Sequence, residues 1–235
     1  MSDWIRVEQA GQEVWQVEAW RSYPWLFHGF STAGTGNMLE KPSRSHFAQA
    51  FELPEPWITV RQVHGNEVLW VGEDWPQGAS IEADGLATRI RGRVLATFYA
   101  DCVPLFFVDP VTRTIAVSHA GWRGTSRKIG CQTIALMVKH GSRIGDIQAA
   151  IGPSIGPCCY AVSSELRDYF PAEVFEERSG QLYLNLWEAN RTQLAAIGVC
   201  QIYTSGSCTM CGPGFFSYRR DRTTHRMAAV MAIKS

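Results

Sequence analysis

The stretch LATFYADCVPLFFVDPVTRTIAVSHAGWRGT, residues 95–125, decides the fold of this chain. Three runs in it are rich in β-branched and aromatic residues and predict strands: 95–99, 103–108 and 115–118. Asp101 and Cys102 interrupt the apolar sequence between the first two runs, and His119 ends the third run just before a glycine-containing turn. Polar side chains at strand ends lie at the rim of a sheet, where functional sites tend to form. We therefore treat the side chains at these strand ends as candidates for a functional site.

Strand and helix signals mix irregularly along the rest of the chain. Apolar runs predict further strands at 14–20, 147–151, 200–204, 215–218 and 227–233, and an extended run at 57–65. Helical periodicity and capping residues predict helices at 43–53, 125–140, 163–170 and 184–197. There is no strict βαβ alternation, linker or internal repeat, so we predict an α+β protein: one layered domain, residues 1–235, with a mixed β-sheet flanked by helices.

Composition excludes several classes of protein. The chain has 235 residues, of which 46% are hydrophobic, enough for a substantial core. Lys plus Arg equals Asp plus Glu at 22 each, which gives no electrostatic case for a nucleic acid or an anionic membrane. The N-terminus lacks signal-peptide features, and no run approaches the ~20 apolar residues of a spanning helix. A soluble cytoplasmic protein is the expectation.

Three residues form a candidate metal site. The extended run at 57–63 ends at His64 and a glycine, the same pattern that surrounds His119. Two imidazoles with the Cys102 thiolate suit Zn²⁺ and leave a fourth coordination position open for water or substrate. The spacing matches no zinc finger, so the residues alone leave two interpretations open: one shared zinc site, or two strand-end histidines and an unrelated cysteine.

Carboxylates and arginines near these residues are further candidates. Asp84 and Asp101 are the nearest acidic residues, and either is expected to orient a ligand histidine or to act as a general base. For Asp84, which precedes a glycine, ordinary turn chemistry is the alternative. Four arginines are candidates for holding an anionic group such as phosphate, although charged residues of this kind are more often solvated: Arg61, Arg219, Arg220 and Arg226.

The remaining cysteines give a weaker signal. The chain has seven cysteines, an odd number that fits free thiols or metal ligands better than a disulfide framework. Cys208 and Cys211 form a single CxxC, which indicates a redox pair, half of a zinc site, or no site at all. The adjacent Cys158 and Cys159 are expected to be small packing residues.

Several motifs in order identify a family resemblance: RQVHG (61–65), ADGLAT (83–88), ADCVPLFFVDP (100–110), SHAGWRGT (118–125), AAIGPSIGPCCYAV (149–162), and CTMC (208–211) with FFSYRRD (215–221). Together they resemble the YfiH-type family, also called laccase-domain or multicopper polyphenol oxidase-like proteins. The resemblance implies a fold similar to the cysteine hydrolase of a cytotoxic necrotizing (CNF) toxin and a zinc site at His64, Cys102 and His119. It also implies phosphorolysis of adenosine, inosine and methylthioadenosine, and deamination of adenosine, with a nucleoside and phosphate as the small-molecule partners.

Three interpretations of the chemistry therefore stand at this stage. In the first, a zinc-dependent nucleoside phosphorylase and deaminase, Asp84, Asp101 and Cys102 are the candidate catalytic residues. In the second, Cys102 is the nucleophile and His119 the base of an amide hydrolase, for instance one that edits a peptidoglycan precursor. In the third, copper oxidises phenols, but the chain has only six histidines, few for a multi-copper cluster.

Overall fold

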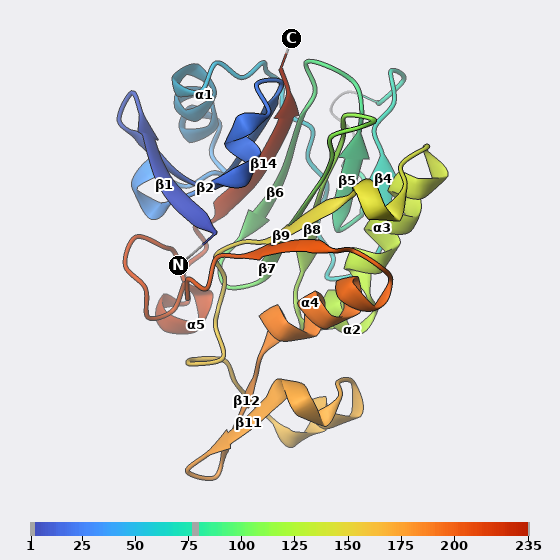
Figure 1. Ribbon diagram of the computed structural model, residues 1–235. Coiled ribbons are helices and arrows are strands. Elements are labelled where there is room, and N and C mark those ends of the chain that lie inside the picture. Colours follow the sequence, from blue (N-terminus) through green and yellow to red (C-terminus); the bar gives the residue numbers. More distant parts are fainter. Residues whose placement is uncertain (1–2, 77–79, 235) are drawn as a thin grey trace.

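A computed structural model describes residues 3–76 and 80–234 (Figure 1). Most strands belong to two large sheets. One is an antiparallel sheet of five strands, in the order β1 (Trp4–Gln9), β2 (Gln12–Val17), β3 (Leu26–Ser31), β14 (Met227–Ile233) and β6 (Val94–Tyr99). The C-terminal strand β14 lies between β3 and β6, so the two ends of the chain are joined in one sheet.

The second sheet has six strands and is mixed. Its order is β13 (Gln201–Thr204), β9 (Gln148–Ile151), β7 (Val103–Asp109), β8 (Thr114–Ala120), β5 (Gly85–Thr88) and β4 (Val68–Trp70). The pairs β13–β9 and β4–β5 are parallel, and the others are antiparallel. The three strands predicted at 95–118 are therefore present, but β6 belongs to the first sheet, whereas β7 and β8 form a hairpin at the centre of the second.

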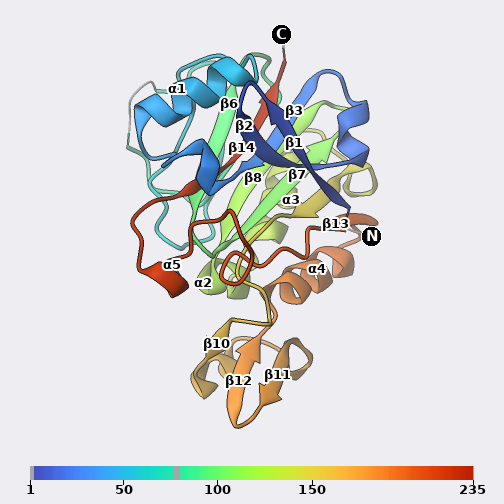
Figure 2. The same cartoon turned by 90° about the vertical axis from the view of Figure 1, so that its left-hand side faces the viewer.

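The two sheets pack face to face, and helices cover their outer faces. Alternate residues of β7 point in opposite directions: Phe106 packs between the sheets, and Phe107 packs on the outer side. Helices α3 (Ile129–Lys139) and α4 (Leu186–Ala196) cover that outer side, while α1 (Lys41–Ala50) covers the outer face of the five-stranded sheet (Figures 1 and 2). Because β7 is buried on both faces, its sequence is almost continuously apolar. The predicted α+β class, with a mixed sheet and flanking helices, is confirmed.

Shorter elements complete the chain. A small sheet of β10 (Ala161–Val162), β12 (Gln181–Leu184) and β11 (Phe175–Arg178) projects from the body at the bottom of Figures 1 and 2. The short α-helices are α2 (Trp122–Ser126) and α5 (Tyr218–Asp221), and 3₁₀ turns lie at Ala19–Ser22, Ala33–Thr35, Ile144–Asp146, Ser164–Asp168 and Ala172–Val174. No helix within the described ranges is long and apolar enough to cross a membrane.

Four predicted elements differ in the structure. The helix predicted at 163–170 is a 3₁₀ turn at Ser164–Asp168. The helix predicted at 125–140 is split into α2 and α3, because Lys128 adopts the left-handed conformation with φ of 57°. The segment predicted as a strand at 215–218 leads instead into α5, because the Ser217 hydroxyl accepts a hydrogen bond from the Arg220 backbone and so caps a helical turn. The extended run at 57–65 makes only isolated bridges, such as Ile58 with Leu95, and joins neither large sheet as a strand.

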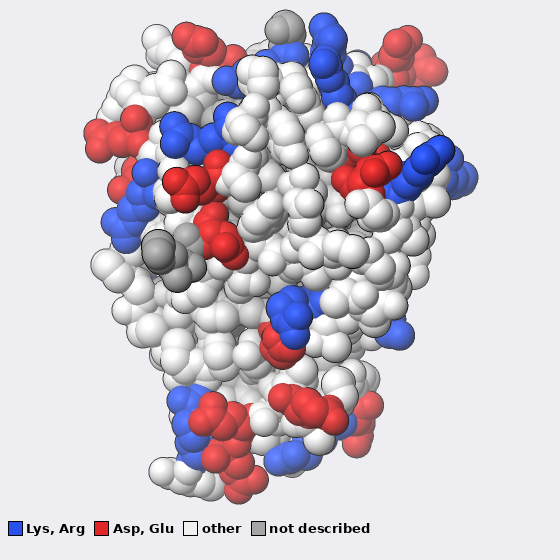
Figure 3. All heavy atoms as spheres, viewed as in Figure 1, with Lys and Arg blue, Asp and Glu red and all other residues white. Residues whose placement is uncertain are grey.

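Basic and acidic side chains are interspersed on the face shown in Figure 3. No large region of that face carries a single sign of charge. This distribution agrees with the balanced composition and gives that face no electrostatic attraction for a polyanion.

Candidate metal centre

The central hairpin brings Cys102 and His119 to the same end of the six-stranded sheet. Cys102 directly precedes β7, and His119 lies one residue before the end of β8. The antiparallel register pairs Val103, the residue after Cys102, with Ala120, the residue after His119. Cys102 and His119 therefore lie near each other across the hairpin. A tight β-hairpin therefore positions both side chains, as the sequence stretch suggested.

His64 reaches the same place through a tight turn held by one carboxylate. Its backbone is left-handed, with φ of 58°. The fully buried Asp84 accepts hydrogen bonds from three successive backbone N–H groups of this turn, those of Val63 at 3.2 Å, His64 at 3.0 Å and Gly65 at 2.6 Å. The left-handed turn points these N–H groups at one anion, so Asp84 fixes the direction of the His64 side chain.

The same carboxylate orients the second histidine. Asp84 Oδ1 lies 2.8 Å from His119 Nδ1, and His119 is almost completely buried. When Nδ1 carries the proton and donates to Asp84, Nε2 of His119 is left with a lone pair for a metal. A carboxylate behind a ligand histidine in this way sets its tautomer and raises its basicity.

The three side chains offer a coherent donor set. One ligand atom from each of His64, Cys102 and His119 lies within 4.8 Å of the others. The two imidazole rings are nearly perpendicular, with centroids 4.8 Å apart. A methyl group on Gly121 would meet Cys102 Sγ at 3.2 Å and His64 Cδ2 at 3.4 Å, so glycine leaves room for this set. Two imidazoles and a thiolate suit Zn²⁺, and the residues present fit that ion.

Electrostatics favour a charged thiol–imidazole pair when no metal is bound. Burial raises the pKa of the Cys102 thiol, but the two histidines outweigh this effect and lower that pKa to about 6. Burial lowers the pKa of His119, but the Cys102 thiolate and Asp84 outweigh it and raise that pKa to about 9. At neutral pH the thiolate is therefore already formed, as a metal ligand or a nucleophile requires.

A cleft of about 570 Å³ opens over the three candidate ligands. Besides them it is lined by Leu39, Val60, Gln62, Phe98, Ala100, Tyr218 and Arg226. Its walls come from the edge strand β6, the inner strand β8, helix α5 and the loops between them. An open cleft over a three-ligand set is typical of a catalytic rather than a structural metal site, because a structural site is closed by a fourth protein ligand.

The four candidate arginines lie in different surroundings. Arg226 lines this cleft, and Arg219 lines a second cleft of about 590 Å³ beside Tyr160 and Trp122. Arg61 is exposed and forms an ion pair with Glu82. Arg220 pairs with Asp221 and donates to three backbone carbonyls, those of Thr209, Met210 and Phe215. A role in binding phosphate stays a prediction for all four, and Arg226 is the one placed beside the candidate metal ligands.

Asp101 faces away from the histidines. Its backbone is left-handed, with φ of 87°, and its carboxylate accepts from Thr209 Oγ1 at 2.7 Å, Ser217 Oγ at 3.0 Å and the Arg219 backbone at 2.6 Å. It therefore ties the turn before Cys102 to the C-terminal loops. A general-base role for Asp84 or Asp101 stays a prediction, and in the structure each carboxylate accepts hydrogen bonds from both backbone and side-chain groups.

Sequence reasoning missed the aromatic walls of the two clefts. Phe98 and the exposed Tyr218 line the cleft over the candidate ligands, and Tyr160 lines the second cleft. Burial is the main cause that raises the pKa of the Tyr160 phenol to about 12, and the negative charge of Cys102 adds to it. The signal for Tyr218 was its place beside the arginines at 219–220. Phe98 gave no such signal, because a phenylalanine in a predicted strand is expected to be a core residue.

Comparison with known proteins gives matches over most of the chain. The family model described as "Multi-copper polyphenol oxidoreductase laccase" matches residues 37–234. Purine nucleoside phosphorylase YlmD of Geobacillus stearothermophilus is 42% identical over 208 residues, covering 80% of this chain and 76% of that protein. Adenosine deaminase RL5, from an unknown prokaryotic organism, is 36% identical over 181 residues, covering 69% of each. The crystal structure of YlmD from Geobacillus stearothermophilus superposes with a TM-score of 0.86 at 33% identity, over 98% of this chain and 99% of that one.

Proposed function

This chain belongs to the family described as multi-copper polyphenol oxidoreductase laccase, and from its site we propose that it is a zinc-dependent purine nucleoside phosphorylase with adenosine deaminase activity. The proposed substrates are adenosine, inosine and methylthioadenosine, together with phosphate. The single observation that carries the proposal is the set of His64, Cys102 and His119 at the floor of an open cleft. The names of the relatives, several of them purine nucleoside phosphorylases and one an adenosine deaminase, support the choice of substrate.

The candidate ligands supply the reactive end of the cleft. Zinc held by them would act as a Lewis acid, polarising an oxygen of phosphate or activating a water. Asp84 has a positioning role in this proposal: it keeps His119 in the tautomer that presents Nε2, and it holds the His64 turn. Because one buried carboxylate accepts hydrogen bonds from the His64 backbone and from the His119 ring, the donor set is pre-organised before any ion binds.

Other residues that line the cleft would bind the nucleoside and the anion. Phe98 and Tyr218 offer aromatic surfaces on which a purine can stack, and Arg226 offers a cation for phosphate. In phosphorolysis the C1′–N9 bond breaks as a phosphate oxygen bonds to C1′, and the purine leaves with a proton. In deamination the bond from C6 to the amino nitrogen breaks as a water oxygen bonds to C6, and ammonia leaves.

Product analysis tests the proposal directly. Zinc-loaded protein is incubated with adenosine, with and without phosphate, and the products are separated by chromatography. We expect adenine and ribose 1-phosphate only with phosphate, and inosine in both cases. Cys102→Ser should lose both activities, while Cys131→Ser, which changes a partly buried cysteine outside the donor set, should keep them. Absence of all three products from zinc-loaded protein rejects the proposal.

A cysteine hydrolase is a second candidate, favoured by one specific observation. The lowered pKa of Cys102 beside His119 is what an activated cysteine nucleophile needs. Its substrate would be an amide, for example in a peptidoglycan precursor. Zinc on the sulfur would block this chemistry, so the two candidates respond oppositely: amide hydrolysis that survives chelation but is lost on alkylation of Cys102 would favour the hydrolase.

Copper-dependent oxidation of phenols is supported less well. Within residues 3–76 and 80–234 two groups of side chains come close enough to share a metal ion, and one of them contains histidine. A cluster of several copper ions needs more imidazoles than that group offers. Oxygen uptake with a phenol and copper-loaded protein would test this candidate separately.

A further inference from the structure

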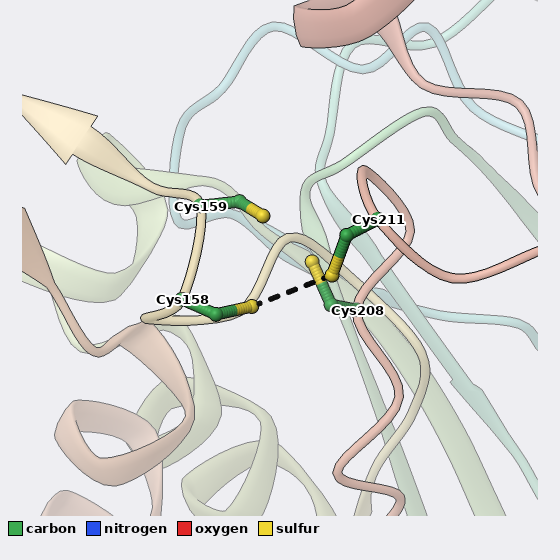
Figure 4. A group of neighbouring side chains, drawn as sticks. All are labelled: Cys158, Cys159, Cys208 and Cys211. Atoms are coloured by element: carbon green, nitrogen blue, oxygen red, sulfur yellow. Dashed lines mark hydrogen bonds between the residues drawn. The ribbon is translucent and has the colours of Figure 1, made fainter.

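Four cysteines outside the candidate active site converge from two loops. Cys158 and Cys159 lie in the loop between β9 and β10, and Cys208 and Cys211 lie in the loop after β13. The four sulfurs all lie within 4.8 Å of one another. Figure 4 shows the side chains of the two loops turned toward a common space. We expected Cys158 and Cys159 to be packing residues, but Cys158 is exposed and both face the other pair. The CxxC therefore has the second pair of thiols that the sequence spacing did not reveal.

The spacing of the sulfurs fits a tetrahedral metal site. A Zn–S bond of about 2.3 Å places the four sulfurs of a tetrahedron about 3.8 Å apart. Cys158 Sγ and Cys211 Sγ are 3.6 Å apart. The other pairs of sulfurs are at most 4.8 Å apart, so each pair needs to come closer by no more than about 1 Å to reach the tetrahedral separation. Small rotations of the exposed Cys158 and Cys211 side chains contribute to such a shift.

The backbone around Cys208 has the tight form that metal-binding CxxC turns require. The Gly156 N–H donates to Cys208 Sγ at 3.2 Å, which stabilises a thiolate. The Gly212 N–H donates to the Cys208 carbonyl at 2.8 Å, and a Cβ on Gly212 would lie 2.4 Å from that oxygen, so glycine is required there. The turn folds Cys211 back toward Cys208, and both thiols face one point.

The two loops are also joined by hydrogen bonds. Ser154 and Cys208 form a bridge, with Ser154 N to Ser207 O at 3.1 Å and Thr209 N to Ser154 O at 3.0 Å. The Arg220 guanidinium, which pairs with Asp221, donates to the carbonyls of Thr209 and Met210 and so holds the shape of the CxxC turn.

We propose that Cys158, Cys159, Cys208 and Cys211 hold a structural zinc ion, distinct from the candidate active-site ion. Four protein thiolates fill the coordination sphere, so this ion has no open position for a substrate. A disulfide between Cys158 and Cys211 would engage only two of the four sulfurs and would leave the other two facing it. Four converging soft donors are instead the arrangement that zinc prefers.

This ion would also brace the turn that carries Cys102. Asp101, the preceding residue, receives a hydrogen bond from Thr209 in the CxxC loop and accepts one on its carbonyl from Ile155 in the other loop, at 2.9 Å. Both cysteine loops therefore hold the left-handed Asp101 in place. A structural ion between them would position Cys102 without touching substrate.

Zinc counting tests the proposal independently of any activity. Protein is purified under reducing, oxygen-free conditions with zinc supplied and excess removed, and zinc per chain is measured by mass spectrometry of the element. We expect Cys211→Ser and Cys158→Ser each to contain one zinc per chain fewer than the wild type. Cys200→Ser, an exposed cysteine outside the cluster, is the matched control and should contain the wild-type amount. His64→Ala should lower zinc at the other site and leave this one filled.

Cobalt substitution gives a second readout. Co²⁺ in the four-thiolate site should produce intense sulfur-to-metal charge-transfer absorption that persists in His64→Ala. In Cys211→Ser it should fall to the weaker absorption that the single thiolate of Cys102 gives at the other site. The proposal is overturned if both cysteine variants keep the wild-type zinc content, if iron replaces zinc in the native protein, or if the purified wild type carries a Cys158–Cys211 disulfide. Because these readouts need no substrate, they stand even if the proposed nucleoside chemistry fails.

Discussion

Replacing Asp84 with Asn probes the carboxylate that serves both histidines. Asp84 accepts four hydrogen bonds: Oδ1 from the His64 backbone and His119 Nδ1, and Oδ2 from the backbones of Val63 and Gly65. Asn keeps the shape but has one accepting oxygen. Whichever way the amide turns, its NH₂ group faces two donors, which then lose their acceptor inside the protein.

The magnitude follows from those two lost bonds. A buried donor left without a partner costs about 1–3 kcal/mol, so Asp84→Asn should lower the free energy of unfolding of the metal-free protein by about 2–6 kcal/mol. The misplaced imidazoles should in addition weaken zinc binding about 10–100-fold, the usual effect of losing a carboxylate behind a ligand histidine. That loss corresponds to about 1.4–2.8 kcal/mol of binding free energy.

Two assays separate these effects. Urea unfolding of metal-free protein measures stability, and competition with a coloured chelator measures zinc affinity at the site. Asp109→Asn is the matched control, because Asp109 is equally buried and accepts from Val111 N at 2.8 Å and Thr112 N at 3.2 Å, in a turn that touches no candidate ligand. The control should lose stability but keep its zinc affinity. If Asp84→Asn binds zinc within about threefold of the wild type, the positioning role of Asp84 is refuted.

Three further predictions concern single side chains. Arg226→Ala should raise the KM for phosphate about tenfold or more in a phosphorolysis assay, a change typical of losing a charged anion contact, while Arg61→Ala, which removes an exposed ion pair, should leave it unchanged. Burial is the main cause that lowers the pKa of His28 from 6.5 to about 3, so its contribution to stability is present above pH 6.5 and is lost as pH falls toward 3. Between pH 7 and 5 the wild type should therefore lose about 2 kcal/mol more than His28→Gln in urea unfolding, and equal losses would contradict the assignment. Gly124→Ala would place a Cβ 3.0 Å from the Gly65 carbonyl oxygen and 3.2 Å from that of His119, and should cost about 1–3 kcal/mol of stability, whereas Gly145→Ala, with open space around it, should cost far less.

Local sequence predicted the central elements well because their signals are short-range. The apolar runs on either side of Asp101 and the turn at 109–112 specify strands and a hairpin through steric preferences of neighbouring residues. The sequence therefore predicted that Cys102 and His119 lie at the ends of strands, and it left open whether the two residues share a site. The left-handed Lys128, by contrast, carries no glycine signal, and it split a helix that periodicity predicted as continuous.

The sequence by itself determined the α+β class, the central hairpin and the residue types suited to a zinc ion. Only the tertiary structure decided which of those residues meet. Asp84 serves both histidines because strand β5 lies beside β8, and Cys158 faces Cys211 because two loops far apart in the chain lie side by side. Such distances depend on strand order and on how layers pack. A chain's local preferences specify the shape of each segment, but the free energy gained by burying both faces of the sheets selects which segments become neighbours.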